Sequence, residues 1–218
     1  MKLLKILLEQ EKILVPRRIK EREKHLARAT QQKIQQYIKD GSKGDLDLKG
    51  TPITSLPDNL ESVGGSLNLY QSKITSLPDN LRSVGGDLNL FNTPITSLPD
   101  NLEVEEHLVL ARTPIEYLPD NLKVKGRISL SYSAIKSLPD NFKYVGGNLN
   151  LQFTPIKSLP DNLKVEGSLW LQYSTIESLP SSLEVEGNLA IRDTPLDYNH
   201  DDIDIKEMAP NIKGKIYR

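Results

Sequence analysis

Pairs of apolar residues, separated by one position of variable character, recur along the chain every 20 or 21 residues. Side chains of a β-strand alternate between its two faces, so both members of a pair point to the same side. The pattern therefore predicts eight short strands, each with one face in a core and the other in solvent. The pairs are Leu46/Leu48, Leu67/Leu69, Leu88/Leu90, Leu108/Leu110, Ile128/Leu130, Leu149/Leu151, Leu169/Leu171 and Leu189/Ile191.

A second marker, Leu-Pro-Asp-Asn-Leu, separates consecutive pairs. It begins at Leu56, Leu77, Leu98, Leu118 and Leu159, and variants of it begin at Leu138 and Leu179. A period this short indicates a solenoid, in which each unit packs only against its neighbours. Each connection leaves roughly eight residues and contains a proline, which is too little for a typical helix, so we expect an extended or polyproline-like segment.

The pairs and the marker together resemble the leucine-rich repeat, in the short Leu-Pro form found in secreted bacterial effectors and in many phage-encoded proteins. The resemblance covers about 70% of the chain. It implies an α+β solenoid: a right-handed coil with one parallel sheet of eight or nine short strands, an extended or polyproline-like convex side and a helical N-terminal cap.

The two ends of the chain differ from the repeats. After Pro16 the sequence reads as a long helix that ends before Gly41, and a shorter apolar helix precedes it. Terminal units of a solenoid cover its apolar ends, so we expect residues 1–43 to form a basic helical cap on the solenoid of residues 44–196. Residues 197–218 should form a C-terminal cap, with a helix at 201–208 and a final strand. The residues of the first apolar run are Leu3, Leu4, Ile6, Leu7 and Leu8.

Two polar columns repeat as regularly as the core. Where the general leucine-rich-repeat pattern has asparagine, this chain has a hydroxyl that we expect to tie the turn to backbone groups. An aspartate follows the proline of the marker, where an Asx-turn is the ordinary role and no metal is needed. The hydroxyl column is Thr51, Ser72, Thr93, Thr113, Ser133, Thr154, Ser174 and Thr194, and the aspartates are Asp58, Asp79, Asp100, Asp120, Asp140 and Asp161.

Composition narrows the function classes. The chain has no cysteine, which excludes disulfides, thiolate metal sites and cysteine-dependent catalysis, including the ubiquitin ligase activity of some Leu-Pro effectors. The histidines His25, His107 and His200 are too dispersed for a metal site or a catalytic triad. The glycine pairs precede strands, as turn residues do, and not helices, as phosphate cradles do. We expect no enzyme, no cofactor and no metal.

Charge is divided between the two parts of the chain. Residues 1–40 hold eleven Lys and Arg against five acids, a balance of +6, and residues 41–218 hold seventeen against twenty-four, a balance of -7. The basic segment is either the solvated face of a cap helix or a docking surface for an acidic protein, nucleic acid or a neighbour's solenoid. Its residues include Arg17, Arg18, Arg22, Lys24 and Arg28.

Aromatic residues gather in the columns that follow the strands. Neighbouring strands lie about 4.8 Å apart, so Tyr132, Phe153 and Tyr173 should form a stripe, flanked by Arg112 and near Trp170. Tyr70 and Phe91 form a second pair. Such residues dominate protein interfaces, although rings at a coil edge can also simply seal it.

We therefore expect a non-enzymatic protein-binding module that recognises a protein partner through its concave face and rim. One alternative is a structural, self-associating or virion component that docks through the basic N-terminal segment, and another is nucleic-acid binding by that segment. The N-terminus has no convincing signal peptide and no stretch could span a bilayer, so we expect a cytoplasmic protein. The resemblance to the short Leu-Pro repeat implies that the cell is bacterial or phage-infected.

Overall fold

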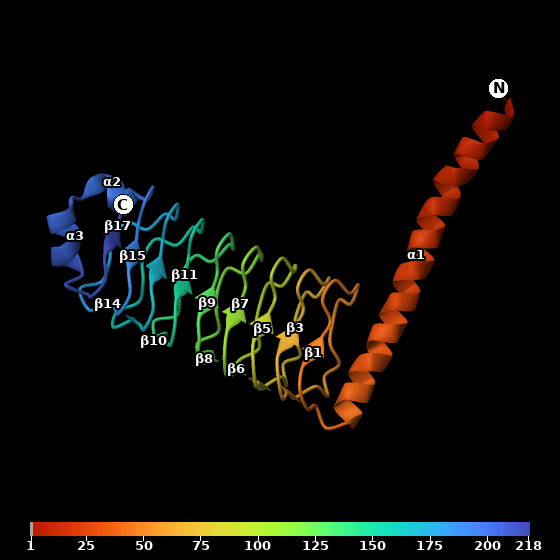
Figure 1. The fold of residues 1–218 in the computed structure, drawn as a ribbon, viewed down its shortest axis with the longest axis horizontal. Coiled ribbons are helices and arrows are strands. Elements are labelled where there is room, and N and C mark those ends of the chain that lie inside the picture. Colours follow the sequence, from red (N-terminus) through yellow and green to blue (C-terminus); the bar gives the residue numbers. More distant parts are fainter. Residues whose placement is uncertain (1) are drawn as a thin grey trace.

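The computed structural model describes the backbone of residues 2–218 and the side chains of residues 19–201 and 203–218. It is a solenoid of coils stacked in one row (Figure 1). Helix α1 (Lys2–Lys39) leaves the row at the end of the first coil, and helices α2 (Pro195–Asn199) and α3 (Asp202–Met208) lie at the other end.

A parallel sheet of nine two-residue strands runs the length of the solenoid, as the apolar pairs predicted. Equivalent positions pair in neighbouring coils, for example Leu46 with Leu67. The last strand comes from the C-terminal segment, where the sequence predicted it. The strands are β1 (Leu46–Asp47), β3 (Leu67–Asn68), β5 (Leu88–Asn89), β7 (Leu108–Val109), β9 (Ile128–Ser129), β11 (Leu149–Asn150), β13 (Leu169–Trp170), β15 (Leu189–Ala190) and β17 (Ile216–Tyr217).

The structure also contains two shorter parallel sheets that the sequence did not predict. Each of their strands lies a few residues before a strand of the main sheet. One contains β2 (Ser62–Val63), β4 (Ser83–Val84), β6 (Glu103–Val104) and β8 (Lys123–Val124), and the other contains β10 (Tyr144–Val145), β12 (Lys164–Val165), β14 (Glu184–Val185) and β16 (Asn211–Ile212). The glycine pairs follow these strands. At Gly85 a Cβ would lie 2.3 Å from the Gly64 carbonyl oxygen, so the close approach of successive coils requires glycine there.

The core is the space that the coils enclose. Both members of each apolar pair are buried, as are the first and last residues of each marker, which are leucines except for Phe142. Leu60, Leu130 and Leu171 are 0% exposed. The chain from the hydroxyl column to the marker contains no regular secondary structure in the described coils, which agrees with the predicted extended convex side.

The Asx-turn prediction for the repeated aspartates is wrong. The turn at the marker is closed by backbone groups: Leu60 N–H donates to the Pro57 carbonyl oxygen at 3.0 Å. Asp58 is exposed, and among the described side chains none of the six repeated carboxylates makes a hydrogen bond. Among all described residues, there is no group of three or more histidine or acidic side chains that could hold a metal.

The sequence also predicted two N-terminal helices, and that prediction is wrong. Helix α1 is continuous through Pro16, because a proline removes one backbone donor while hydrogen bonds on either side of it can persist. The side chains of Leu3, Leu4, Ile6, Leu7 and Leu8 lie outside the described residues. None of the described helices is both long enough and apolar enough to cross a membrane.

Only the last turns of α1 cap the solenoid. Ile34 is fully buried in the common core, and the Tyr37 hydroxyl accepts from Gly64 N–H at 3.2 Å. Toward the N-terminus the helix diverges from the coils (Figure 1). There Ile19 and Leu26 are 53% and 48% exposed, so these two apolar side chains of the described part of the helix are not buried against the coils.

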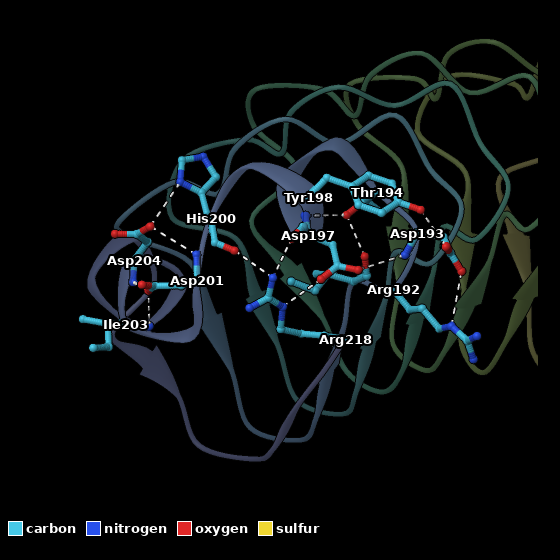
Figure 2. Close-up of polar contacts among 11 residues, drawn as sticks. Arg192, Asp193, Thr194, Asp197, Tyr198, His200, Asp201, Ile203, Asp204 and Arg218 are labelled. Carbon is cyan, nitrogen blue, oxygen red and sulfur yellow. Dashed lines mark hydrogen bonds and ion pairs between the residues drawn. The ribbon is translucent and has the colours of Figure 1, made fainter.

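The C-terminal cap is fastened by polar contacts (Figure 2). The Thr194 hydroxyl accepts from Asp197 N–H and caps α2, which was not predicted. Asp201 caps α3, and the N–H groups of Asp204 and Ile203 lower the pKa of its carboxyl. The guanidinium of Arg218 donates to the Asp197 carboxylate at 2.7 Å and to the carbonyl oxygen of His200 at 2.8 Å.

Candidate binding surface

One residue in each repeat has a left-handed backbone conformation. It lies two positions after the second apolar residue of each pair, where the chain turns away from the sheet. Its N–H extends the sheet, as when Tyr132 N–H donates to the Gln152 carbonyl oxygen at 3.0 Å. We call these residues the left-handed column: Gly50, Gln71, Asn92, Arg112, Tyr132, Phe153, Tyr173 and Asp193, with φ between 53° and 64°.

The residue types in this column change along the solenoid. Gly50, Asn92 and Asp193 are of the kinds that adopt positive φ readily. Tyr132, Phe153 and Tyr173 are not, because for a side chain with a Cβ the conformation costs roughly 1–2 kcal/mol per residue. Aromatic residues therefore adopt a strained backbone conformation in three successive coils. Backbone strain of this kind tends to persist at functional sites.

The side chains of the column and its neighbours stack into one row. The ring centroids of Tyr132 and Phe153 are 4.3 Å apart, and those of Phe153 and Tyr173 are 4.5 Å apart. The Tyr70 and Phe91 rings stack at 5.2 Å. The Arg112 guanidinium lies 5.2 Å from the Tyr132 ring centroid and 6.0 Å from that of Phe91.

Arg112 thus joins two groups that the sequence analysis treated as separate, and the six residues form what we call the aromatic row. The rings of the row stack face to face, so their edges point outward. Tyr132, Phe153 and Tyr173 remain 50%, 39% and 45% exposed. The hydroxyl column next to them already closes the coil, since Thr154 is 3% exposed.

Trp170 lies apart from the row, and within the described chain no ring contact joins them. Its side chain is half-buried and lines a hollow of about 230 Å³ on the outer face of the main sheet. We call this the strand-face hollow. Its other lining residues are Val109, Arg127, Ile128, Ser129, Asn148 and Asn150.

A ladder of side-chain acceptors runs beside the hollow, along the positions that precede the strands. Each accepts from the N–H of the equivalent residue in the next coil. The Asp45 carboxylate accepts from Ser66 N–H at 2.7 Å, and His107 Nδ1 accepts from Arg127 N–H at 3.1 Å. The sequence analysis missed this ladder because its members share only an acceptor atom and not a residue type.

The histidines stand on different elements. His107 belongs to the ladder, His25 is exposed on α1, and His200 lies in the C-terminal cap with Nδ1 3.8 Å from the Asp204 carboxylate. The structure brings none of them into one site.

The basic segment is spread over the projecting part of α1. Arg22, Lys24 and Arg28 are exposed, and the side chains of Arg17 and Arg18 lie outside the described residues. Between them, Glu23 binds Lys73 of the solenoid at 2.9 Å. Acidic residues therefore interrupt the basic surface.

Comparisons with known proteins agree on the fold. No family model and no curated protein matches the sequence. The chain is similar to the leucine-rich-repeat domain of a Shigella effector, with 20% identity, 84% of each chain covered and a TM-score of 0.54. This similarity shows the fold, a parallel-strand solenoid of the leucine-rich-repeat kind.

Two further solved structures are more distant. YopM, a leucine-rich effector protein from Yersinia pestis, is 18% identical over 69% of this chain, with a TM-score of 0.43. A leucine-rich-repeat protein from Leptospira interrogans is 17% identical over 80% of this chain, with a TM-score of 0.37. The chain spans only 55% and 54% of those two chains.

Proposed function

We propose that this chain is a non-enzymatic module that binds a protein partner through its strand face and the adjoining rim. The observation that carries the proposal is the part of the aromatic row that lies in the left-handed column. Side chains that the backbone tolerates only at a cost form a continuous, half-exposed surface in four successive coils, from Arg112 to Tyr173.

The composition of the row suits protein recognition. Tyrosine and arginine are enriched among residues that dominate binding energy, and aromatic side chains add contact area at small entropic cost. The stacking fixes the rings before a partner arrives, so little rotamer freedom is left to lose on binding. The repeated Leu-Pro marker further supports membership of the short bacterial and phage form of the repeat.

A matched pair of variants tests the proposal. Partners captured by the full chain from a bacterial lysate would be identified, and the affinity of each would be measured for the wild type and for Phe153→Asn with Tyr173→Asn. Asparagine tolerates positive φ, so this variant removes the rings without straining the backbone. We expect affinity to fall by at least about 2 kcal/mol.

The control is Tyr144→Asn, which removes a 52% exposed tyrosine from β10, outside the main sheet and the aromatic row. We expect it to leave affinity unchanged. A partner that binds both variants as tightly as the wild type would refute a role for the row.

Self-association through α1 is the second candidate, because Ile19 and Leu26 are exposed on a helix that projects from the solenoid. Sizing chromatography of the full chain and of residues 29–218, each at low and high salt, separates the two functions. An oligomer that disappears on removal of the helix would favour the assembly role. A monomer in all four runs would favour the recognition module.

A further inference from the structure

The strand-face hollow presents hydrogen-bond donors that the fold leaves unused. In Asn148 the side-chain oxygen accepts from Ser168 N–H at 2.8 Å, and in Asn150 it accepts from Gln152 N–H at 3.0 Å. A backbone N–H can be matched only by the oxygen of the amide, so these two bonds fix the orientation of both side chains. Each residue then has its NH2 group left to offer a ligand.

The remaining polar groups of the hollow are donors as well. Arg127 uses its backbone in the ladder and the sheet, but within the described chain its guanidinium has no ion pair or hydrogen bond. The Trp170 indole N–H can only donate, and it too has no partner among the described residues. Ser129 adds a hydroxyl.

Arg127 is the one charged side chain among the residues that line the hollow. On the strand face, the columns between and beside the apolar pairs carry Arg127, Arg192 and Lys215 in the C-terminal half, and they hold no aspartate or glutamate from Arg127 onward. Arg192 pairs with Asp193 of the left-handed column at 3.2 Å. The acidic residues of these columns, Asp45, Asp47 and Asp87, lie in the N-terminal half. An acidic ligand is therefore attracted to one half of the face and repelled from the other.

We propose that the strand-face hollow is the anchor point for a carboxylate side chain on an acidic segment of the protein partner. A carboxylate accepts through both oxygens and matches the planar fork of a guanidinium. The apolar surfaces of Val109 and the Trp170 ring suit the methylene groups of such a side chain. At about 230 Å³ the hollow is below the roughly 300–1,000 Å³ of small-molecule pockets, which fits a single side chain.

This inference rests on the proposed function and specifies the partner's chemistry. Trp170 is the one tryptophan in the sequence, so its fluorescence reports on the hollow directly. The probe is an acetylated and amidated tetraglutamate peptide, titrated into the full chain at constant ionic strength, with the tetraglutamine peptide as the neutral control. We expect a saturable change in Trp170 emission with tetraglutamate and none with tetraglutamine.

Arg127→Gln should weaken tetraglutamate binding at least about tenfold, because a hydrogen bond to a charged group is lost. Its unfolding midpoint should match that of the wild type, since the guanidinium has no hydrogen bond or ion pair within the described chain. The control is Arg22→Gln, which makes the same change of charge on α1 and should leave binding unchanged.

Three results would overturn the assignment: no saturable response to tetraglutamate, an equal response to tetraglutamine, or full affinity in Arg127→Gln. Inorganic phosphate that displaces tetraglutamate and itself binds more tightly would also overturn it, in favour of a phosphate site. If the tetraglutamate experiment fails but the variant Phe153→Asn with Tyr173→Asn loses affinity for the partner, the proposed function still holds and only the assignment of the hollow is wrong. Intact partner affinity in that variant, with the hollow's response as expected, would move binding from the row to the hollow.

Discussion

Two adjacent columns of the solenoid, one residue apart in sequence, carry opposite kinds of information. The hydroxyl column holds only threonine or serine in all eight units, and from Ser72 onward its members are at most 5% exposed. The left-handed column immediately before it holds seven different residue types and includes the exposed rings of Tyr132, Phe153 and Tyr173. Residues that close the coil are constrained to one chemistry, whereas their neighbours are free to differ.

Within the hydroxyl column, threonine and serine solve the same problem differently. In both cases the carbonyl oxygen three residues earlier needs a donor. The Thr113 hydroxyl donates to Leu110 O at 2.7 Å, whereas in the next coil the backbone N–H of Ser133 donates to Leu130 O at 3.1 Å. The Ser133 hydroxyl is then buried without a partner among the described residues. The fold therefore requires a hydrogen bond to this carbonyl oxygen, but it does not require that a side-chain hydroxyl donate it.

The largest effect is expected in the core beneath both columns. Leu130→Ala should lower the free energy of unfolding by about 2–5 kcal/mol, because it leaves a cavity between coils. Chemical denaturation measures it, with Leu26→Ala on the projecting helix as a control of the same chemistry at an exposed site. A loss below about 0.5 kcal/mol at Leu130 would mean that the apolar pairs do not form the core.

A smaller effect should distinguish the two kinds of closure. Thr113→Val should cost about 1–3 kcal/mol, because it leaves a buried carbonyl oxygen without its donor. Ser133→Ala should be neutral or slightly stabilising, because its hydroxyl is already unpaired. Equal costs at the two sites, measured by denaturation, would rule out the proposed division of labour.

Removal of residues 1–28 should change stability by less than about 1 kcal/mol. The described side chains in this segment are mostly exposed, and the ion pair of Glu23 with Lys73, at 49% and 59% side-chain exposure, is of a kind worth little. Ile34→Ala in the retained part of α1 should cost more, since Ile34 is fully buried. If the truncation costs as much as Ile34→Ala, the whole helix would act as the cap.

The sequence predicted those features that depend on a repeated residue type. Apolar residues at fixed offsets were enough to predict eight of the nine strands of the main sheet and a common core, and the spacing of the C-terminal segment predicted the ninth strand. It could not predict the acceptor ladder, in which Asp45, Ser66 and His107 do one job with different side chains. The position of Arg112 between two aromatic groups depends on the positive φ of its column, which the residue type itself does not favour.

Helix α1 shows a second reason why a prediction from the sequence was wrong. Local signals correctly placed its end near Gly41, but Pro16 does not interrupt it. The hollow at Trp170 was missed for a third reason. Its donors become available only because the oxygens of Asn148 and Asn150 are occupied by backbone groups of the next coil and of the turn.

The central claim is that the fold does not require the aromatic row. The free energy of unfolding of the variant Phe153→Asn with Tyr173→Asn tests it most directly. Loss of two stacked pairs at about 0.5–1.5 kcal/mol each should be offset by relief of roughly 1–2 kcal/mol of backbone strain per residue. The account predicts a net change within about 1 kcal/mol of zero. A loss of more than about 2 kcal/mol would contradict it, because the rings would then be part of what holds the coils together.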